Sequence, residues 1–135
     1  MSKIKLISYG ATEEVTGSCH LLEIDNFKIL IDCGFFQGSK ENYLKNWSEF
    51  KFNPQDINAL ILTHAHLDHC GRIPKLVKDG YRGKIYATAP TIELANLIMV
   101  DNFNIIHSKA KNFSYAPLYS QEDLKKVNKS WSKIN

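Results

Sequence analysis

The sequence predicts an α/β protein in which helices pack on a mixed sheet. Three observations support this fold class. Residues 3–34 contain apolar segments separated by polar turns, residues 57–63 (INALILT) form a continuous apolar run of the kind found in buried strands, and strands alternate with helical periodicity from Ile57 onward. The length of 135 residues suits one domain with its own core.

The first part of the chain is predicted to form strands and one irregular segment. Three strands are expected, over residues 3–10, 19–25 and 27–34. An Asp-Asn turn joins the last two of them. Residues 35–56, which are rich in aromatic and polar side chains, are expected to form an excursion over the surface.

Helices dominate the second part of the chain. They are predicted over residues 73–79, 91–107 and 120–131, with a short strand over residues 84–90. The middle helix has Thr91 as its expected N-cap and an amphipathic pattern with steps of three and four, formed by Leu94, Leu97, Ile98, Asp101 and Ile105. The last helix opens on a Ser-x-x-Asp capping pattern at Ser120 and Asp123.

Composition and charge narrow the class of protein. A hydrophobic content of 44% with 23% charged residues is ordinary for a soluble globular domain. We find no apolar run long enough for a signal peptide or a membrane span, so we expect a cytoplasmic protein without a membrane partner. The three cysteines lack paired spacing, which favours reduced thiols over a disulfide framework.

The net charge of +3 is concentrated near the end of the chain. Residues 107–135 carry six lysines and two acidic residues, with Phe113, Tyr115, Tyr119 and Trp131 between them. We therefore expect a basic helical tail over this range. It would either bind a polyanion such as RNA or form an ordinary solvated helix face, and no single residue is assigned to nucleic-acid binding.

The strongest chemical pattern is the stretch LTHAHLDHCG, Leu62–Gly71, which follows the buried strand directly. Side chains at the end of a strand project into the crevice at the carboxyl edge of a sheet. His64 and His66 are expected to ligate one metal ion, and Asp68 and His69 a second one nearby, as in hydrolases that use two metals. Imidazole and carboxylate ligands suit zinc, and also manganese or iron.

Asp32 ends another apolar strand and has two interpretations. It would either orient a ligating histidine or form the turn before Gly34. The remaining histidines, His20 and His107, are expected to be structural. Cys70 lies beside the cluster but is not predicted as a ligand, because structural zinc sites usually pair their cysteines.

The motif THAHLDHCG after INALIL resembles the metallo-β-lactamase superfamily, and its flanking segments resemble the RNA-processing β-CASP branch. Those segments are GATEEVTGSCHLLE, ILIDCGFFQG, RIPKLVKDGYRGKIYATAPT, ELANLIMVDNFNI and APLYSQEDLKKV. The resemblance runs from Lys3 to about Val127. It implies the N-terminal half of an αββα sandwich, with residues 1–135 forming one partial domain whose basic tail leads toward the second half.

The resemblance also assigns roles to residues. It implies that Asp32 orients the site, that His64 and His66 hold one zinc, and that Asp68 and His69 hold the other. Asp68 would also position the bridging hydroxide that attacks an RNA phosphodiester. The family's later metal ligands and its inserted β-CASP domain have no counterpart in these residues.

The expected function is therefore that of an N-terminal fragment of a zinc-dependent, ribonuclease-like hydrolase, weak or inactive alone. Two alternatives stay open. Copies of the chain could pool ligands in a homo-oligomer and act on a small substrate, or the chain could be a non-catalytic module that binds RNA or protein.

Overall fold

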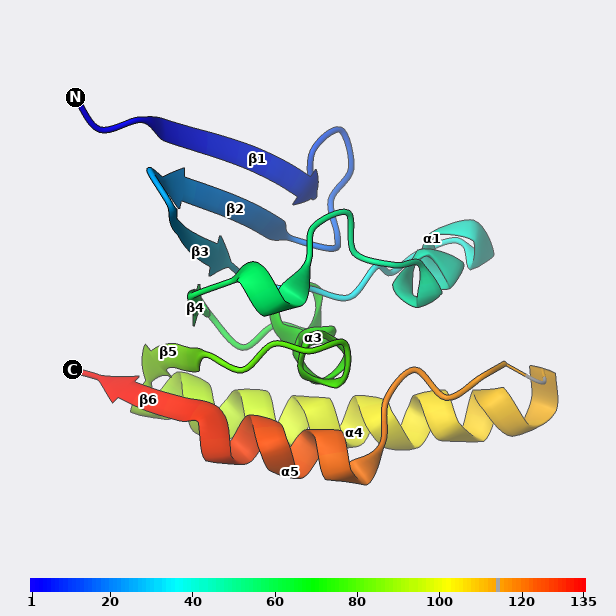
Figure 1. The fold of residues 1–135 in the computed structure, drawn as a ribbon. Helices are drawn as coiled ribbons and strands as arrows, with labels where there is room; N and C mark the ends of the chain where they lie inside the picture. Colours follow the sequence, from blue (N-terminus) through cyan, green and yellow to red (C-terminus); the bar gives the residue numbers. More distant parts are fainter. Residues whose placement is uncertain (114) are drawn as a thin grey trace.

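The computed structural model describes residues 1–113 and 115–135, except for the side chain at position 113. It forms one sheet with strand order β1-β2-β3-β4-β5-β6 (Figure 1). In chain order the elements are β1 (Ile4–Gly10), β2 (Cys19–Ile24), β3 (Phe27–Ile31), α1 (Lys40–Leu44), the 3-10 turns η1 (Lys45–Trp47) and η2 (Pro54–Asp56), β4 (Ala59–Ile61), α2 (Leu67–Cys70), α3 (Ile73–Lys78), β5 (Lys84–Thr88), α4 (Ala89–Phe113), α5 (Gln121–Ser130) and β6 (Trp131–Ile134).

The sheet is mixed, as predicted. Strands β1, β2 and β3 pair antiparallel, whereas β3, β4, β5 and β6 run parallel to one another. Parallel strands need a crossover connection between them, and in this chain the helical segments provide it. The expected α/β class with helices packed on the sheet is confirmed.

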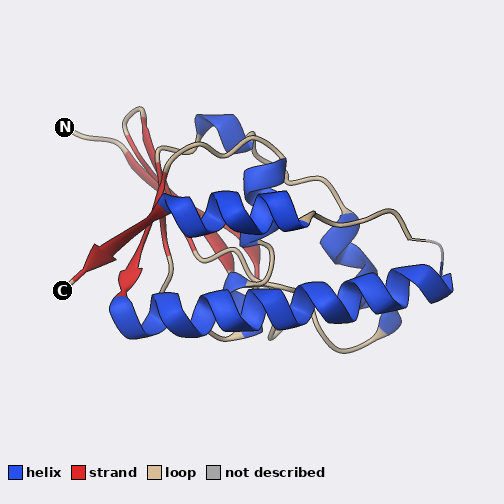
Figure 2. Cartoon of the chain, turned by 90° about the horizontal axis from the view of Figure 1, so that it is seen from below, coloured by secondary structure: helices blue, strands red, loops and turns tan. Residues whose placement is uncertain are grey.

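One face of the sheet forms the core. A single row of side chains crosses four strands at paired positions and is almost fully buried: Leu21, Leu30, Leu60 and Ile85. Helices α3, α4 and α5 cover this row, and α4 runs along α5 in both views (Figure 2). Because alternate residues of a strand point to opposite faces, the neighbouring row must point away from these helices.

That second face is apolar and open. Its row consists of Leu6, Leu22, Ile29 and Ala59, at paired positions on four strands. Leu6 is 63% exposed, and the other three side chains are half-buried. A sheet that buries one face under helices and leaves an apolar second face corresponds to half of a layered sandwich.

The segment predicted as a surface excursion is in fact tied into the interior. Phe35 and Phe36 are buried, and Asn46 is completely inaccessible. The Asn46 side chain accepts a hydrogen bond from the Phe36 amide at 2.8 Å and donates to the Phe36 and Tyr43 carbonyls at 2.9 and 2.8 Å. One buried amide thus replaces the missing strand or helix pairing of this backbone. Most of residues 37–56 do lie at the surface, as predicted, but this buried anchor was missed because composition does not reveal such a partner.

Helix α4 begins earlier and packs on a different side than its sequence indicated. It starts at Ala89, so Thr91 lies inside the helix and is not its N-cap. Leu94 and Leu97, two residues of the predicted amphipathic pattern, are 54% and 68% exposed, whereas Ala95 and Met99 are buried. Almost every position from 92 to 100 is apolar, so several faces fit the same spacing.

The end of the chain combines a correct and a missed prediction. The capping box of α5 forms as expected, since the Asp123 amide donates to the Ser120 side chain while the Asp123 carboxylate accepts from the Ser120 amide. The predicted last helix stops at Ser130, however, and Trp131 opens β6, which pairs parallel with β5. A strand of four residues that follows a helix without a break has no local sequence marker.

The basic segment 107–135 is not a separate tail. Tyr119 and Val127 are buried in the molecule, while the lysines of α5 stay exposed on its outer side. Phe113 cannot be placed in this scheme, because its side chain lies outside the described residues. Within the described part of the chain, no helix is sufficiently long and apolar to cross a bilayer.

Alkaline conditions are expected to destabilise the fold through Tyr81. Burial raises the pKa of this phenol above its usual value, and its hydroxyl donates to the Lys84 carbonyl. Above about pH 10 the unfolded chain releases this proton while the folded chain keeps it, so the free energy of unfolding falls as pH rises. Below that pH the contribution is complete. Urea unfolding between pH 8 and 11 is expected to show a shallower decline for Tyr81→Phe than for wild type; parallel declines would contradict the assignment.

Candidate metal centre

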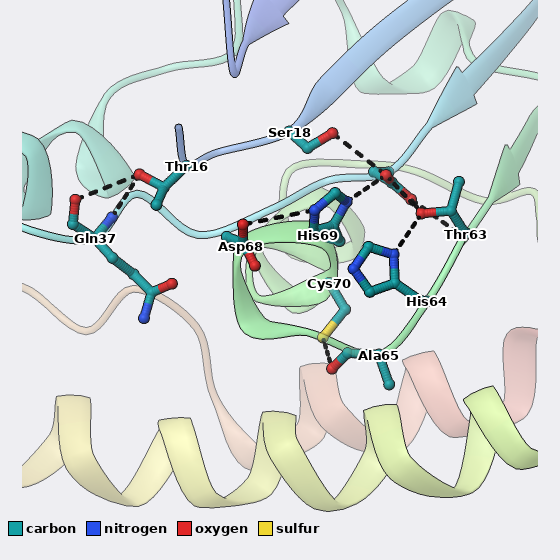
Figure 3. A network of polar contacts seen from close by, with 10 residues as sticks. Thr16, Ser18, Gln37, Thr63, His64, Ala65, Asp68, His69 and Cys70 are labelled. Atoms are coloured by element: carbon teal, nitrogen blue, oxygen red, sulfur yellow. Dashed lines mark hydrogen bonds and ion pairs between the residues drawn. The ribbon is translucent and has the colours of Figure 1, made fainter. Parts of the chain in front are cut away.

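The predicted ligands gather where two parallel strands end. Asp32 follows β3, and Thr63 and His64 follow β4, the neighbouring strand. The chain then turns into the short helix α2, which carries Asp68 and His69. Because β3 and β4 are parallel, their carboxyl ends meet at one edge of the sheet. Figure 3 shows Thr63, His64, Asp68 and His69 gathered there, and Asp32 contacts Thr63 and His69.

Asp32 is the most constrained residue of this cluster. It is 2% exposed, and its backbone has a φ of 61°, in the left-handed region. Its carboxylate accepts hydrogen bonds from the amide and hydroxyl of Thr63, both at 2.9 Å, and lies 3.3 Å from the Ser18 hydroxyl. The two interpretations of Asp32 are therefore compatible in this geometry, since it shapes the turn and also faces the histidines.

The ring of His69 is fixed between two carboxylates. Its Nδ1 lies 2.7 Å from the Asp32 carboxylate, and its Nε2 lies 3.5 Å from the Asp68 carboxylate. A histidine that donates its Nδ1 proton to a carboxylate has its Nε2 lone pair available for a metal ion. Asp68 and His69, the pair expected to share one ion, thus have their donor atoms side by side.

His64 and His66 come together from the extended segment before α2. Their ring centroids are 4.8 Å apart, and the His64 ring is 3.9 Å from that of His69. The Nδ1 of His64 is 3.0 Å from the Thr63 hydroxyl. All four predicted ligands therefore belong to one cluster, and the backbone carbonyl of His66 accepts from the His69 amide at 2.9 Å to start the helix.

The donor set fits a metal ion in its chemistry, because imidazole nitrogens and a carboxylate are normal zinc ligands and the buried Asp32 orients one of them. The cluster offers each metal ion two side-chain ligands and no third. Among residues 1–113 and 115–135, no three histidine, cysteine, aspartate or glutamate side chains are arranged to hold one ion.

The cysteines near the centre are structural. Cys19, Cys33 and Cys70 are all reduced and completely buried. Cys70 donates from its Sγ to the Ala65 carbonyl, and burial raises the pKa of its thiol to about 12.

Two contacts of the cluster were not predicted. Thr63 binds both Asp32 and His64, and Ser18 approaches Asp32 from the end of the first loop. The position of Thr63 directly before the motif could have indicated its role, whereas Ser18 has no such signal. The spare histidines lie elsewhere, His20 against the Ser8 hydroxyl and His107 against the ring of Phe103.

Comparisons with known proteins agree on one family. Residues 21–135 match the model of the metallo-beta-lactamase superfamily domain. The chain is 40% identical over 124 residues to ribonuclease TTHA0252 of Thermus thermophilus, covering 92% of this chain and 26% of that protein. It is also 35% identical to transcription termination factor FttA of Cenarchaeum symbiosum and 41% identical to that of Methanosarcina mazei, covering 93% and 83% of this chain but only 19% and 18% of those proteins.

Proposed function

This chain belongs to the metallo-beta-lactamase superfamily, and on that premise we propose that it contributes the first half of the metal centre of an RNA-cleaving hydrolase. The observation that carries the proposal is the cluster of four donors beside a buried, orienting carboxylate. The similarity to a ribonuclease and to transcription termination factors supports RNA as the substrate.

Each residue of the cluster has a role in this proposal. His64 and His66 would hold one zinc ion, and Asp68 and His69 the second. Bound zinc would polarise the phosphodiester and make water a nucleophile near neutral pH. Asp32 would keep the proton of His69 on Nδ1, and Asp68, whose half-buried carboxylate lies beside Nε2 of His69, would help to position the attacking water.

The proposed centre needs further ligands. Two protein ligands for each ion are fewer than the three that catalytic zinc usually has. We propose that the others come from polypeptide outside these 135 residues, and that the chain alone hydrolyses RNA weakly. The chain spans about a quarter or less of the relatives it matches, which supports this division.

The open face of the sheet also supports the proposal that further polypeptide completes this half. A row of apolar side chains across four strands needs a cover, and a second sheet on this face would complete the sandwich. Either the remaining half of the protein or another copy of the chain would provide that cover. Sedimentation of the chain alone is the direct measurement, and a stable, compact monomer would weigh against this part of the proposal.

Removing one histidine tests the metal centre. In the metal-free chain titrated with zinc, His66→Ala is expected to weaken zinc binding at least about tenfold and to abolish whatever hydrolysis of a phosphodiester reporter the wild type supports. The matched control is His20→Ala, which removes a histidine bonded to Ser8 away from the cluster and is expected to change neither quantity. Equal zinc affinity in wild type and His66→Ala would refute the proposal.

A further inference from the structure

Arg72 is a buried cation without a counter-charge. It is 5% exposed, and its Nε donates to the Gly34 carbonyl while Nη2 has no hydrogen-bond partner. None of the ion pairs among the described residues includes it. Buried charges in proteins are almost always paired, because removing them from water without compensation is costly.

Aromatic rings compensate only part of this cost. The Arg72 guanidinium lies 4.5 Å from the ring centroid of Phe36 and 5.2 Å from that of Phe50. Ring faces stabilise a cation, yet they accept no hydrogen bond from the free Nη2. The guanidinium therefore keeps its capacity for a bidentate contact with a carboxylate or a phosphate.

Arg72 also lines a cavity of about 290 Å³, which we call the Arg72 pocket. Its wall is aromatic: Tyr9 and Phe52 are 5.1 Å apart between ring centroids, as are Phe50 and Phe52. Two lysines and two glutamates also line this pocket: Lys45, Lys51, Glu14 and Glu49. Lys45 pairs with Glu14 at 3.3 Å, so Arg72 and the exposed Lys51 are the cations left for a ligand.

We propose that the Arg72 pocket binds a small oxyanion carried on a flat ring. The oxyanion would pair with the guanidinium and supply the counter-charge that Arg72 lacks. The ring would pack on Phe50 and Phe52. A cavity of about 290 Å³ is near the lower limit of small-molecule sites, which fits an aromatic carboxylate or a single nucleotide. The pocket is separate from the histidine cluster, since none of the four proposed ligands lines it.

Calorimetric titration of the chain in EDTA tests this site. The probes are benzoate, uridine 5′-monophosphate and inorganic phosphate. Saturable binding is expected for a ring-bearing probe, with inorganic phosphate weaker, and the tighter of benzoate and the nucleotide identifies the oxyanion. Arg72→Met is expected to weaken binding at least about tenfold, because methionine keeps an unbranched apolar side chain but lacks the guanidinium group.

Three further variants make the result unambiguous. Lys51→Glu changes an exposed position at the pocket and is expected to weaken binding several-fold even if Arg72→Met fails to fold. Arg82→Met removes an arginine outside the pocket, and His66→Ala removes a proposed metal ligand. Both variants are expected to bind the ring-bearing probe with the same affinity as wild type. Absence of saturable binding, or equal affinity in wild type and Lys51→Glu, would overturn the proposal.

Discussion

Replacing Asp32 by asparagine is expected to lower the free energy of unfolding by about 1.5–3 kcal/mol, the range for losing a hydrogen bond to a buried charged group. The amide keeps the shape of the side chain and tolerates the left-handed backbone at φ 61°. It loses one acceptor oxygen and presents donors to Thr63 and His69, which both donate to this carboxylate. Urea unfolding of the metal-free protein measures the loss without any assumption about function.

The same substitution is expected to weaken zinc binding by about 10–100-fold, the usual effect of losing a carboxylate that orients a ligand. Asp25→Asn is the matched control, since Asp25 is another left-handed aspartate, with φ 54°, but is exposed and far from the cluster. The control should cost less than about 1 kcal/mol, as surface substitutions do. Similar losses in both variants would mean that the Asp32 contacts contribute little.

Gly34→Ala is expected to prevent folding or to cost more than about 4 kcal/mol, the range reserved for severe steric defects. A Cβ at Gly34 would lie 1.7 Å from the Asp68 carbonyl oxygen and 2.8 Å from the His69 amide nitrogen. Both are backbone atoms, so no side chain can move aside. Relief would require the two segments to separate, and with them the hydrogen bond from the Cys33 amide to the His69 carbonyl.

The matched control is Gly38→Ala. Gly38 has a φ of 109°, and its nearest neighbour for a new Cβ is the Asn42 side chain at 3.8 Å. It therefore isolates backbone strain from overlap and is expected to cost about 1–2 kcal/mol. Thermal unfolding compares the variants directly. A Gly34→Ala protein as stable as Gly38→Ala would show that the Gly34 and Asp68 segments can move apart at little cost.

Much of the fold could be predicted from patterns of neighbouring residues. Polar turns between apolar segments located β1, β2 and β3, and the buried strand before LTHAHLDHCG located β4 and the cluster after it. The resemblance to the metallo-β-lactamase superfamily and its RNA-processing members is confirmed. These predictions were correct because each depends on the chemistry of a short stretch of chain.

The missed features depend on partners that are distant in sequence. β6 exists because it pairs with β5, and the buried face of α4 is chosen by what lies across from Ala95 and Met99. In the candidate site, Asp32 meets Thr63 across 31 residues, a contact created by two adjacent parallel strands. Local periodicity contains no information about such partners, so these features had to wait for the structure.

The strand order carries a consequence for biosynthesis. Every strand pairs with the one that precedes it in the chain, from β1 to β6. The sheet can therefore assemble in the order of translation, because each new strand pairs with a strand that has already been synthesised. Once β3 and β4 have paired, Asp32 and Thr63 lie side by side directly after these two strands, so the carboxylate that orients His69 can be in place before α4 and α5 are synthesised.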